Sequence, residues 1–218
     1  MYHLVGEVQN TGSVPVMDVI VSIVCYDNYG VVVDSIDTEV LLDVLLVGRK
    51  APFMYVASQE NSAKINTYTV DLKSFDVSSD KPEKLEIISH SWSITGYIVR
   101  LAIAVGQVRN NGALIAIMVK IVATFYSGPD GTGNVVGVSI AVSSPPSLNP
   151  SEVGTFEIVP VDATNREHLF VSLVLTSESL EYSGNVVPEF PAMVLMIFMI
   201  ATLVVAVTMG RKRGKPIF

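Results

Sequence analysis

The chain has a single cysteine, Cys25, among its 218 residues, which excludes an internal disulfide and a metal site built from several thiolates. Its three histidines, His3, His90 and His168, are far apart and have no neighbouring ligand at metal-binding spacing. It has no Asn-x-Ser/Thr sequon, since Asn149 is followed by proline. Only 16% of its residues are charged and 50% are hydrophobic. This composition excludes a disordered chain or a charged coiled coil and suggests a membrane segment.

Basic residues are scarce outside the C-terminal end. Residues 1–187 carry 10 basic and 20 acidic side chains, a net charge of −10, within a chain of net charge −7. An acidic body is a poor partner for phosphate backbones, so we expect no nucleic-acid partner. Four of the 14 basic residues lie within the last eight positions: Arg211, Lys212, Arg213 and Lys215.

The one long apolar run, residues 192–209, contains no charged residue. As a helix of 18 residues it would be roughly 27 Å long, close to the thickness of a bilayer core. We therefore predict a transmembrane helix at 192–209 and a basic tail at 210–218. Because basic residues stay cytoplasmic, this topology places the tail inside the cell and residues 1–187 outside.

A proline-rich neck, residues 184–191, precedes the predicted helix and contains Pro188, Glu189, Phe190 and Pro191. This order of Pro-Glu-Phe, apolar helix and short basic tail resembles the C-terminal sorting signals of archaeal surface proteins. In that family a sortase-like membrane enzyme removes the helix and can transfer the protein to a lipid. An ordinary single-pass anchor with a proline-rich neck is the alternative.

The first residues, MYHLVGEVQN, have neither the basic nor the apolar region of a signal peptide. An exported body needs such a signal, so we expect one that was removed, lost from a fragmentary gene or missed by a late start codon. The competing interpretation is a tail-anchored protein with a cytosolic body. That topology would place the basic tail outside, against the charge rule.

Two segments of the body match each other at an offset of 100 that grows to 103. Residues 4–12 (LVGEVQNTG) match residues 104–112 (AVGQVRNNG), and the matches continue in order over about 70 residues, which indicates two copies of one module. The paired positions that we take as the module's turn and core signature are Gly6/Gly106, Asn10/Asn110, Gly12/Gly112, Tyr26/Tyr126 and Phe53/Phe156.

Each copy has the pattern of β-strands. Odd positions from 17 to 25 are all apolar, and positions 117 to 125 repeat that parity. Alternation with a period of two predicts a strand with one face on a core. Asn-Thr-Gly and Asn-Asn-Gly at 10–12 and 110–112 suggest hairpin turns, as do residues 27–30 and 127–131. Short strands separated by turns predict an all-β fold of two sandwiches.

The order Gly-x-Val-x-Asn-x-Gly, a strand ending near Tyr-Asp, and then Gly-x-Val-Val resembles the FxLYD family. These are small immunoglobulin-like modules of bacterial and archaeal surface proteins, and they often occur in tandem. The first copy has Ile-Val-Cys-Tyr-Asp at 23–27 and the second has Ala-Thr-Phe-Tyr-Ser at 123–127, so neither reproduces the naming motif in full. The resemblance implies two tandem immunoglobulin-like sandwiches and no known catalysis.

These observations give the expected domain boundaries. The first module occupies residues 1–90, with residues 85–88 as its closing strand, and the second occupies 98–183. A linker at 91–97 joins them, and Trp92 within it is expected to pack between the domains.

No catalytic, cofactor or metal site is expected. Cys25 has inward parity and is expected to be a small core residue, because Phe125 takes its place in the second copy. Asp27, Asn28, Asp34 and Asp37 could supply oxygen ligands to a calcium ion, but they lack an EF-hand order, and we favour the interpretation as acidic surface turns. Gly-Pro-Asp-Gly-Thr-Gly at 128–133 lacks the lysine and the helix of a phosphate loop, so we expect a hairpin.

The sequence thus predicts a non-enzymatic cell-surface protein, anchored in the membrane by a single pass, that presents two sandwiches as a binding or spacer surface. Its expected partners are the lipid bilayer and other cell-surface proteins. The alternative is an accessory extracellular subunit of a transporter or of a secreted-enzyme complex.

Overall fold

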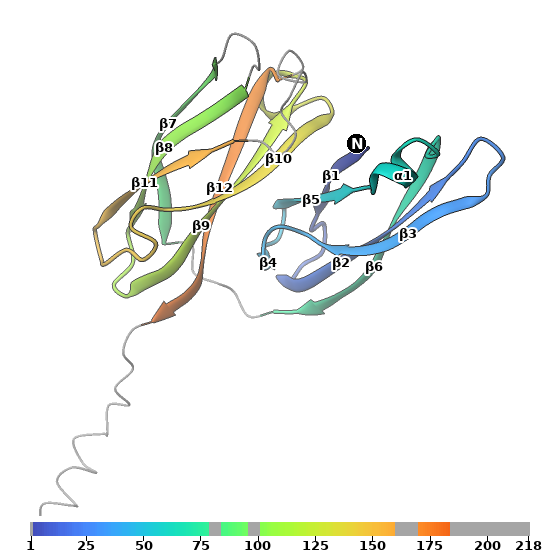
Figure 1. The fold of residues 1–218 in the computed structure, drawn as a ribbon. Coiled ribbons are helices and arrows are strands. Elements are labelled where there is room, and N and C mark those ends of the chain that lie inside the picture. The colour runs from blue at the N-terminus through green and yellow to red at the C-terminus, as the bar shows by residue number, and fades with distance from the viewer. Residues whose placement is uncertain (1, 79–83, 96–100, 160–169, 184–218) are drawn as a thin grey trace, which may run out of the picture. The chain divides into compact units, whose positions relative to one another are not determined.

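The computed structural model describes residues 2–78, 84–95, 101–159 and 170–183, and most of these residues are in β-strands (Figure 1). The all-β class predicted from the sequence is therefore confirmed for this part of the chain. Within these residues, no helix is long and apolar enough to cross a membrane. The predicted span at 192–209, its neck and its basic tail lie outside the described residues.

Strands β1 to β6, here called the N-terminal module, form two sheets. In one sheet, β1 (His3–Gln9) pairs antiparallel with β5 (Lys50–Val56). In the other, the central strand β2 (Val16–Tyr26) pairs with β6 (Thr67–Val77) along one edge. Its other edge pairs with β3 (Val32–Glu39) and then with the short β4 (Val44–Leu45). A single helical turn, α1 (Gln59–Ser62), connects β5 to β6.

Strands β7 to β12, here called the C-terminal module, also form two sheets. The first has the order β11-β8-β7, made by β11 (Val153–Ile158), β8 (Leu101–Asn110) and β7 (Leu85–Thr95). The second has the order β10-β9-β12, made by β10 (Val135–Val142), β9 (Ile115–Tyr126) and β12 (Ser172–Ser183). A short 3₁₀ turn, Pro129–Gly131, lies between β9 and β10.

From residue 19 along β2 and from residue 119 along β9, the residues predicted to face a core are buried. Val19, Val21, Ile23 and Cys25 are all buried in the N-terminal module. In β9 the opposite face is buried as well at Val122, Thr124 and Tyr126, which the alternation did not predict. The predicted parity fails at the start of both strands, where Val16 and Ala116 are buried instead of the residues that follow them. The reason is a backbone irregularity at two positions 100 residues apart, Asp18 with φ of 50° and Met118 with φ of 51°. A residue in the left-handed region shifts the alternation of side chains by one position.

The Asn-Thr-Gly and Asn-Asn-Gly segments are not hairpin turns, which corrects the sequence-based expectation. β1 pairs with β5 and β2 pairs with β3, β4 and β6, so residues 10–15 carry the chain from one sheet to the other. The connection between β8 and β9 crosses between sheets in the same way. By contrast, residues 27–31 and 127–134 do join paired antiparallel strands, as expected for hairpins.

The strand expected to close the first module belongs to the second one. Residues 85–95 form the single strand β7, which pairs with β8 from Leu85↔Asn110 to Thr95↔Leu101. Residues 91–95 of the expected linker at 91–97 are therefore in a strand, and residues 96–100 lie outside the described part of the chain. Trp92, expected between the domains, packs instead against the core of the C-terminal module.

The described residues contain two clusters of buried hydrophobic side chains, one from residues 4–57 together with Val122 of β9 and the other from residues 102–170. In the N-terminal module the largest fully buried side chains are Ile23, Leu45 and Val21. In the C-terminal module Phe125 and Phe170 stack with their ring centroids 4.9 Å apart. Other members of that core are Val108, Val119, Ile121, Leu148, Phe156 and Ile158.

Candidate binding surface

Asn10 and Asn110 stabilise the connections that carry the chain from one sheet to the other, β1 to β2 and β8 to β9. Asn10 is 7% exposed, and its side-chain amide donates hydrogen bonds to the carbonyls of Val14 and Leu45, each at 2.9 Å. Its Oδ1 accepts from the amide of Gly12 at 2.9 Å. The side chain thus satisfies backbone groups on both sides of the connection, which is why asparagine stands where the chain leaves β1.

Asn110 makes the same three bonds in the C-terminal module and is fully buried. It donates to the carbonyls of Leu114 and Leu148, each at 2.8 Å, and accepts from the amide of Gly112 at 2.9 Å. Leu45 and Leu148 are also paired in the sequence match, so the asparagine donor and the leucine carbonyl that accepts from it occur together in both copies. These residues are structural elements, and they give the modules no chemistry toward a ligand.

Gly6 and Gly106 lie under the rings of Phe53 and Phe156. A Cβ at Gly6 would lie 2.6 Å from the Phe53 ring, and one at Gly106 would lie 2.4 Å from the Phe156 ring. Because such distances are far inside van der Waals contact, only glycine fits there. At Gly106 the Cβ would also meet the backbone carbonyl oxygen of Ser89 in β7 at 2.5 Å.

Tyr26 and Tyr126 occupy the same backbone position but different surroundings. The carbonyls of both accept a bond at 2.8 Å, from the amides of Asn66 and Val171 respectively. The Tyr126 side chain is 3% exposed and its hydroxyl donates to a carboxylate oxygen of Glu7. Burial raises the pKa of Tyr126, and the hydrogen bond to Glu7 and the charge of that carboxylate raise it further.

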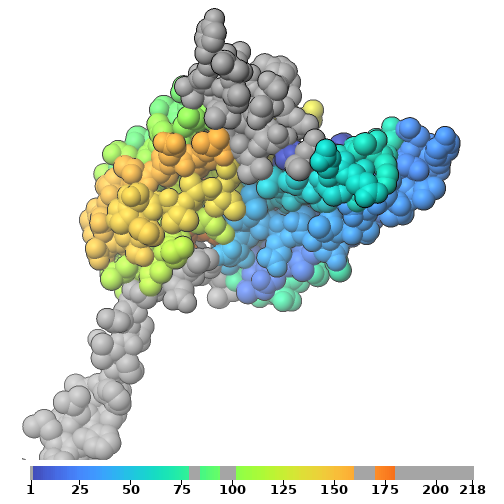
Figure 2. Space-filling view, viewed as in Figure 1, coloured from blue at the N-terminus to red at the C-terminus, as the bar shows by residue number. Residues whose placement is uncertain are grey.

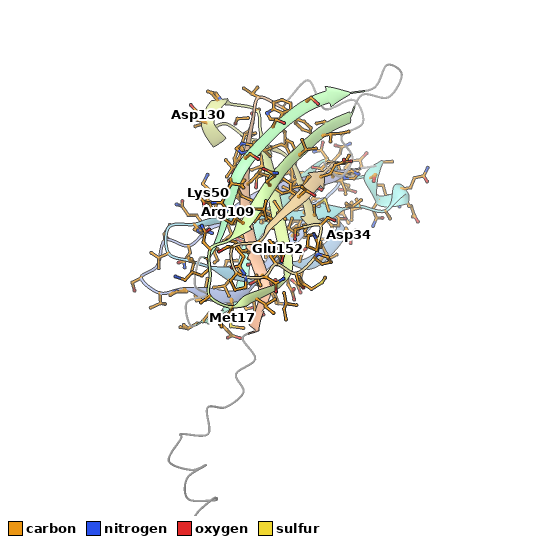
Figure 3. The ribbon with its side chains drawn as sticks, turned by 90° about the vertical axis from the view of Figure 1, so that its left-hand side faces the viewer. Met17, Asp34, Lys50, Arg109, Asp130 and Glu152 are labelled. Atoms are coloured by element: carbon orange, nitrogen blue, oxygen red, sulfur yellow. The ribbon has the colours of Figure 1, made fainter. Side chains whose placement is uncertain are left out.

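The acidic residues considered for calcium are engaged in separate contacts. Asp27 accepts from the backbone amides of Tyr29 and Val31 at 2.8 and 2.9 Å, which fixes the β2–β3 turn. Asp34, labelled in Figure 3, accepts from the Tyr55 hydroxyl at 2.6 Å and from Asn61 at 3.0 Å. Asp37 forms an ion pair with Lys73. In the ranges that the structure describes, no three His, Cys, Asp or Glu side chains gather as they would around a metal.

Cys25 is a core residue, as the parity predicted, with none of its side chain exposed. Burial raises the pKa of its thiol, and the negative charge of Asp34 raises it further. Since the thiolate is the reactive form, this position disfavours nucleophilic chemistry. The Tyr55 hydroxyl, through its hydrogen bond, instead lowers the pKa of Asp34 and keeps that carboxylate charged.

A group of charged residues that the sequence did not reveal joins elements of the two modules. Lys120 on β9 is paired with Asp43 at 2.9 Å and with Glu178 at 2.6 Å, and the Asp43 amide also donates to Glu178 at 2.9 Å. The side chains of Lys120 and Glu178 are only 16% and 10% exposed. Burial lowers the pKa of Lys120, but the bonds to Asp43 and Glu178 outweigh it and raise the pKa overall. The one signal in the sequence was a lysine within an otherwise apolar strand.

Among the hollows on the described surface, two lie on different modules. The larger, of about 720 Å³, lies over β8 and its neighbours and is lined by polar residues such as His90, Gln107 and Glu157. The smaller, of about 370 Å³, lies on the N-terminal module and is mainly apolar. We call it the β1–β6 groove; its lining residues are Val8, Gln9, Asn10, Thr11, Gly12, Ser13, Val14, Val16, Val19, Leu45, Leu72 and Phe75. An apolar concave surface with exposed backbone groups beside it is the arrangement best suited to bind another molecule.

Comparison with known proteins does not identify the chain. No family model matches it, and neither a curated protein nor a solved structure shows significant similarity to it.

Proposed function

We propose that the chain is a non-enzymatic cell-surface protein, in which two tandem immunoglobulin-like sandwiches of FxLYD type form a body held at the membrane by the C-terminal helix. The body presents a binding or spacer surface to the outside, and its partners are other surface proteins. The observation that carries this proposal is the run of 18 uncharged residues at 192–209 followed directly by Arg211, Lys212 and Arg213.

The character of the described body supports a binding or spacer role. The residues shared by the two copies stabilise the connection between the two sheets, as Asn10 and Asn110 do, or allow close packing, as Gly6 and Gly106 do. A module repeated for catalysis would be expected to share polar residues that packing does not explain. The surface instead offers the apolar β1–β6 groove and the long exposed strand β3, visible in blue in Figure 2.

Protease treatment of intact cells tests the orientation. An outward-facing body should be degraded from its exposed loops, such as residues 27–31, where Tyr29 is 91% exposed. A fragment carrying residues 192–218 should stay in the membrane. Complete protection of the body in intact cells, with degradation only after lysis, would contradict the proposal.

The mass of the mature protein distinguishes the two forms of anchoring. Removal of the helix near Pro188 and transfer to a lipid would give a body that lacks residues 192–218 and carries an added lipid mass. An uncleaved anchor would give the mass of a chain ending at Phe218. Replacing Glu189 and Phe190 by alanine should block processing in the first case and change nothing in the second.

A further inference from the structure

The turn between β2 and β3, residues 27–31, projects from one end of the N-terminal module and exposes apolar side chains (Figure 1). Tyr29 is 91% exposed, Val31 is 60% exposed, and Val32, the first residue of β3, is 54% exposed. Single apolar residues are common on protein surfaces, but three within four positions of one turn concentrate apolar area at its end. We call these three side chains the β2–β3 tip. None of them lines the β1–β6 groove, so the tip is a separate surface.

The equivalent turn in the other copy of the module lacks this feature. Residues 127–134, between β9 and β10, contain no aromatic residue and no valine, leucine or isoleucine. Both turns join paired antiparallel strands, so the module folds equally well with a polar turn at this place. The apolar residues of the β2–β3 tip are therefore not a requirement of the fold. Their exposure to water is explained if they are covered by another molecule.

Hydrogen bonds fix the backbone of the tip. The Asp27 carboxylate accepts from the amides of Tyr29 and Val31 at 2.8 and 2.9 Å. The Asp27 amide donates to the carbonyl of Val31 at 2.9 Å, and the amide of Gly30 donates to the carbonyl of Asp27 at 3.2 Å. Gly30 has a φ of 78°, a conformation that favours glycine. A turn fixed in this way loses little conformational entropy when it binds, which is how a rigid aromatic anchor contributes affinity.

Negative charge borders the tip. Asp27 lies at the start of the turn, and Asp34 follows Val32 by two positions on β3. Within the part of the chain that the structure describes, neither carboxylate is paired with a lysine or an arginine, and both accept from neutral donors such as the Tyr55 hydroxyl. A protein surface that covers the tip should therefore carry positive charge around it. An anionic lipid surface would be repelled by the same carboxylates.

We propose that the β2–β3 tip inserts into an apolar pocket of a partner protein whose rim carries lysine or arginine side chains. Tyr29 fills the pocket, while Val31 and Val32 cover its mouth. The basic rim meets Asp27 and Asp34. Tyrosine suits this role because its ring supplies apolar contact area and its hydroxyl bonds to a polar group inside the pocket. This inference rests on the proposed binding function and names both the surface that binds and the chemistry of the partner.

Photo-crosslinking in intact cells that carry the full chain tests the proposal. The probe is p-benzoylphenylalanine in place of Tyr29, which keeps an aromatic side chain at the tip. Irradiation should give one discrete adduct with another protein, and mass spectrometry should place the contact among apolar residues with lysine or arginine beside them. The same probe at Thr132, an exposed position in the equivalent turn of the other copy, is the matched control and should give at most about a tenth of that adduct.

Substitutions beside the probe test the two parts of the contact. Val31→Ser and Val32→Ser should each lower the adduct yield at least about threefold, because each removes apolar area from the tip. Asp27→Asn keeps an oxygen that accepts from the two backbone amides but removes the charge, so it should lower the yield at least about twofold. Val47→Ser, at a valine 49% exposed between β4 and β5, is the control and should leave the yield unchanged. Equal urea midpoints for the purified variants would show that the fold is intact.

The proposal would be overturned if no adduct rose above the level at Thr132, or if the yield ignored Val31→Ser and Asp27→Asn. An adduct with lipid alone, or with a second copy of this chain, would also overturn it, because the occupant would then be of another kind. A contact mapped to a site without basic residues would contradict the charged rim. Failure of the tip is distinguishable from failure of the proposed surface location, because protease treatment of intact cells reports the orientation of the body whatever the tip binds.

Discussion

Removal of the Asn110 side chain should destabilise the C-terminal module more than any surface substitution. In Asn110→Ala the buried carbonyl of Leu148, the carbonyl of Leu114 and the amide of Gly112 all lose their side-chain partner. The Leu148 carbonyl keeps its bond from the Ala116 amide at 3.0 Å, so the cost is that of three lost hydrogen bonds, about 1 kcal/mol each. We therefore expect a loss of about 3 kcal/mol in the free energy of unfolding, which is about 1.5 M in urea midpoint at an m-value of about 2 kcal/mol/M.

Urea denaturation followed by circular dichroism measures this effect. Asn28→Ala, at an exposed turn position, is the matched control and should change the free energy by less than about 0.5 kcal/mol. Asn110→Asp keeps the size and the acceptor for Gly112 but loses both donors and buries a charge, so it should be at least as harmful as alanine. If Asn110→Ala were no more destabilising than Asn28→Ala, the hydrogen bonds of the Asn110 side chain would not stabilise the connection between β8 and β9.

Four further substitutions, with one control, test other parts of the structure by urea denaturation. Gly6→Ala should lower the free energy of unfolding by about 1–3 kcal/mol, because its methyl forces the Phe53 ring aside. Gly106→Ala should lower it more, because its methyl would also meet the backbone of β7. Equal losses in the two variants would argue against that contact. Lys120→Met should cost about 3 kcal/mol by leaving Glu178 and Asp43 without their cation, whereas the control Lys73→Met removes only an exposed pair and should cost at most about 1 kcal/mol. The pKa of Asp34 is lowered in the folded state, so its carboxylate should stabilise the fold above the ordinary pKa of 3.8, and this contribution should disappear as the pH falls through the lower folded value. The difference in free energy of unfolding between the unmodified chain and Asp34→Asn should therefore shrink from pH 5 to pH 2. A difference that stays constant over this range would contradict the role given to Asp34.

Local patterns in the sequence were enough to predict the strands and their buried faces. The inward residues at 19–25 and 119–125 follow from the pattern of a single strand, which needs no knowledge of pairing. The burial of Val122 and Thr124 on the other face of β9 was not foreseen. The same parity placed Cys25 in the core. The irregularities at Asp18 and Met118 were missed because methionine does not signal a positive φ, and aspartate, although enriched there, adopts one only uncommonly.

Pairing between strands was beyond the reach of these patterns. Asn-Thr-Gly suits both a hairpin and a crossing between sheets, and the choice depends on the Leu45 carbonyl, which lies 35 residues away. Leu85 and Ile87 would fit the core of either module by their apolar character, so the sequence alone assigned β7 to the wrong neighbour. The contacts of Lys120 with Asp43 and Glu178 likewise join residues far apart in the chain.

The orientation of the chain in the membrane is the central claim, and antibody labelling of intact cells tests it most directly. One epitope tag is inserted after Tyr29, in the exposed turn between β2 and β3, and a second is fused after Phe218. The account predicts that intact cells are labelled through the tag at Tyr29, while the tag at Phe218, when it is retained, is reached only after permeabilisation. Labelling of intact cells at Phe218 but not at Tyr29 would contradict it.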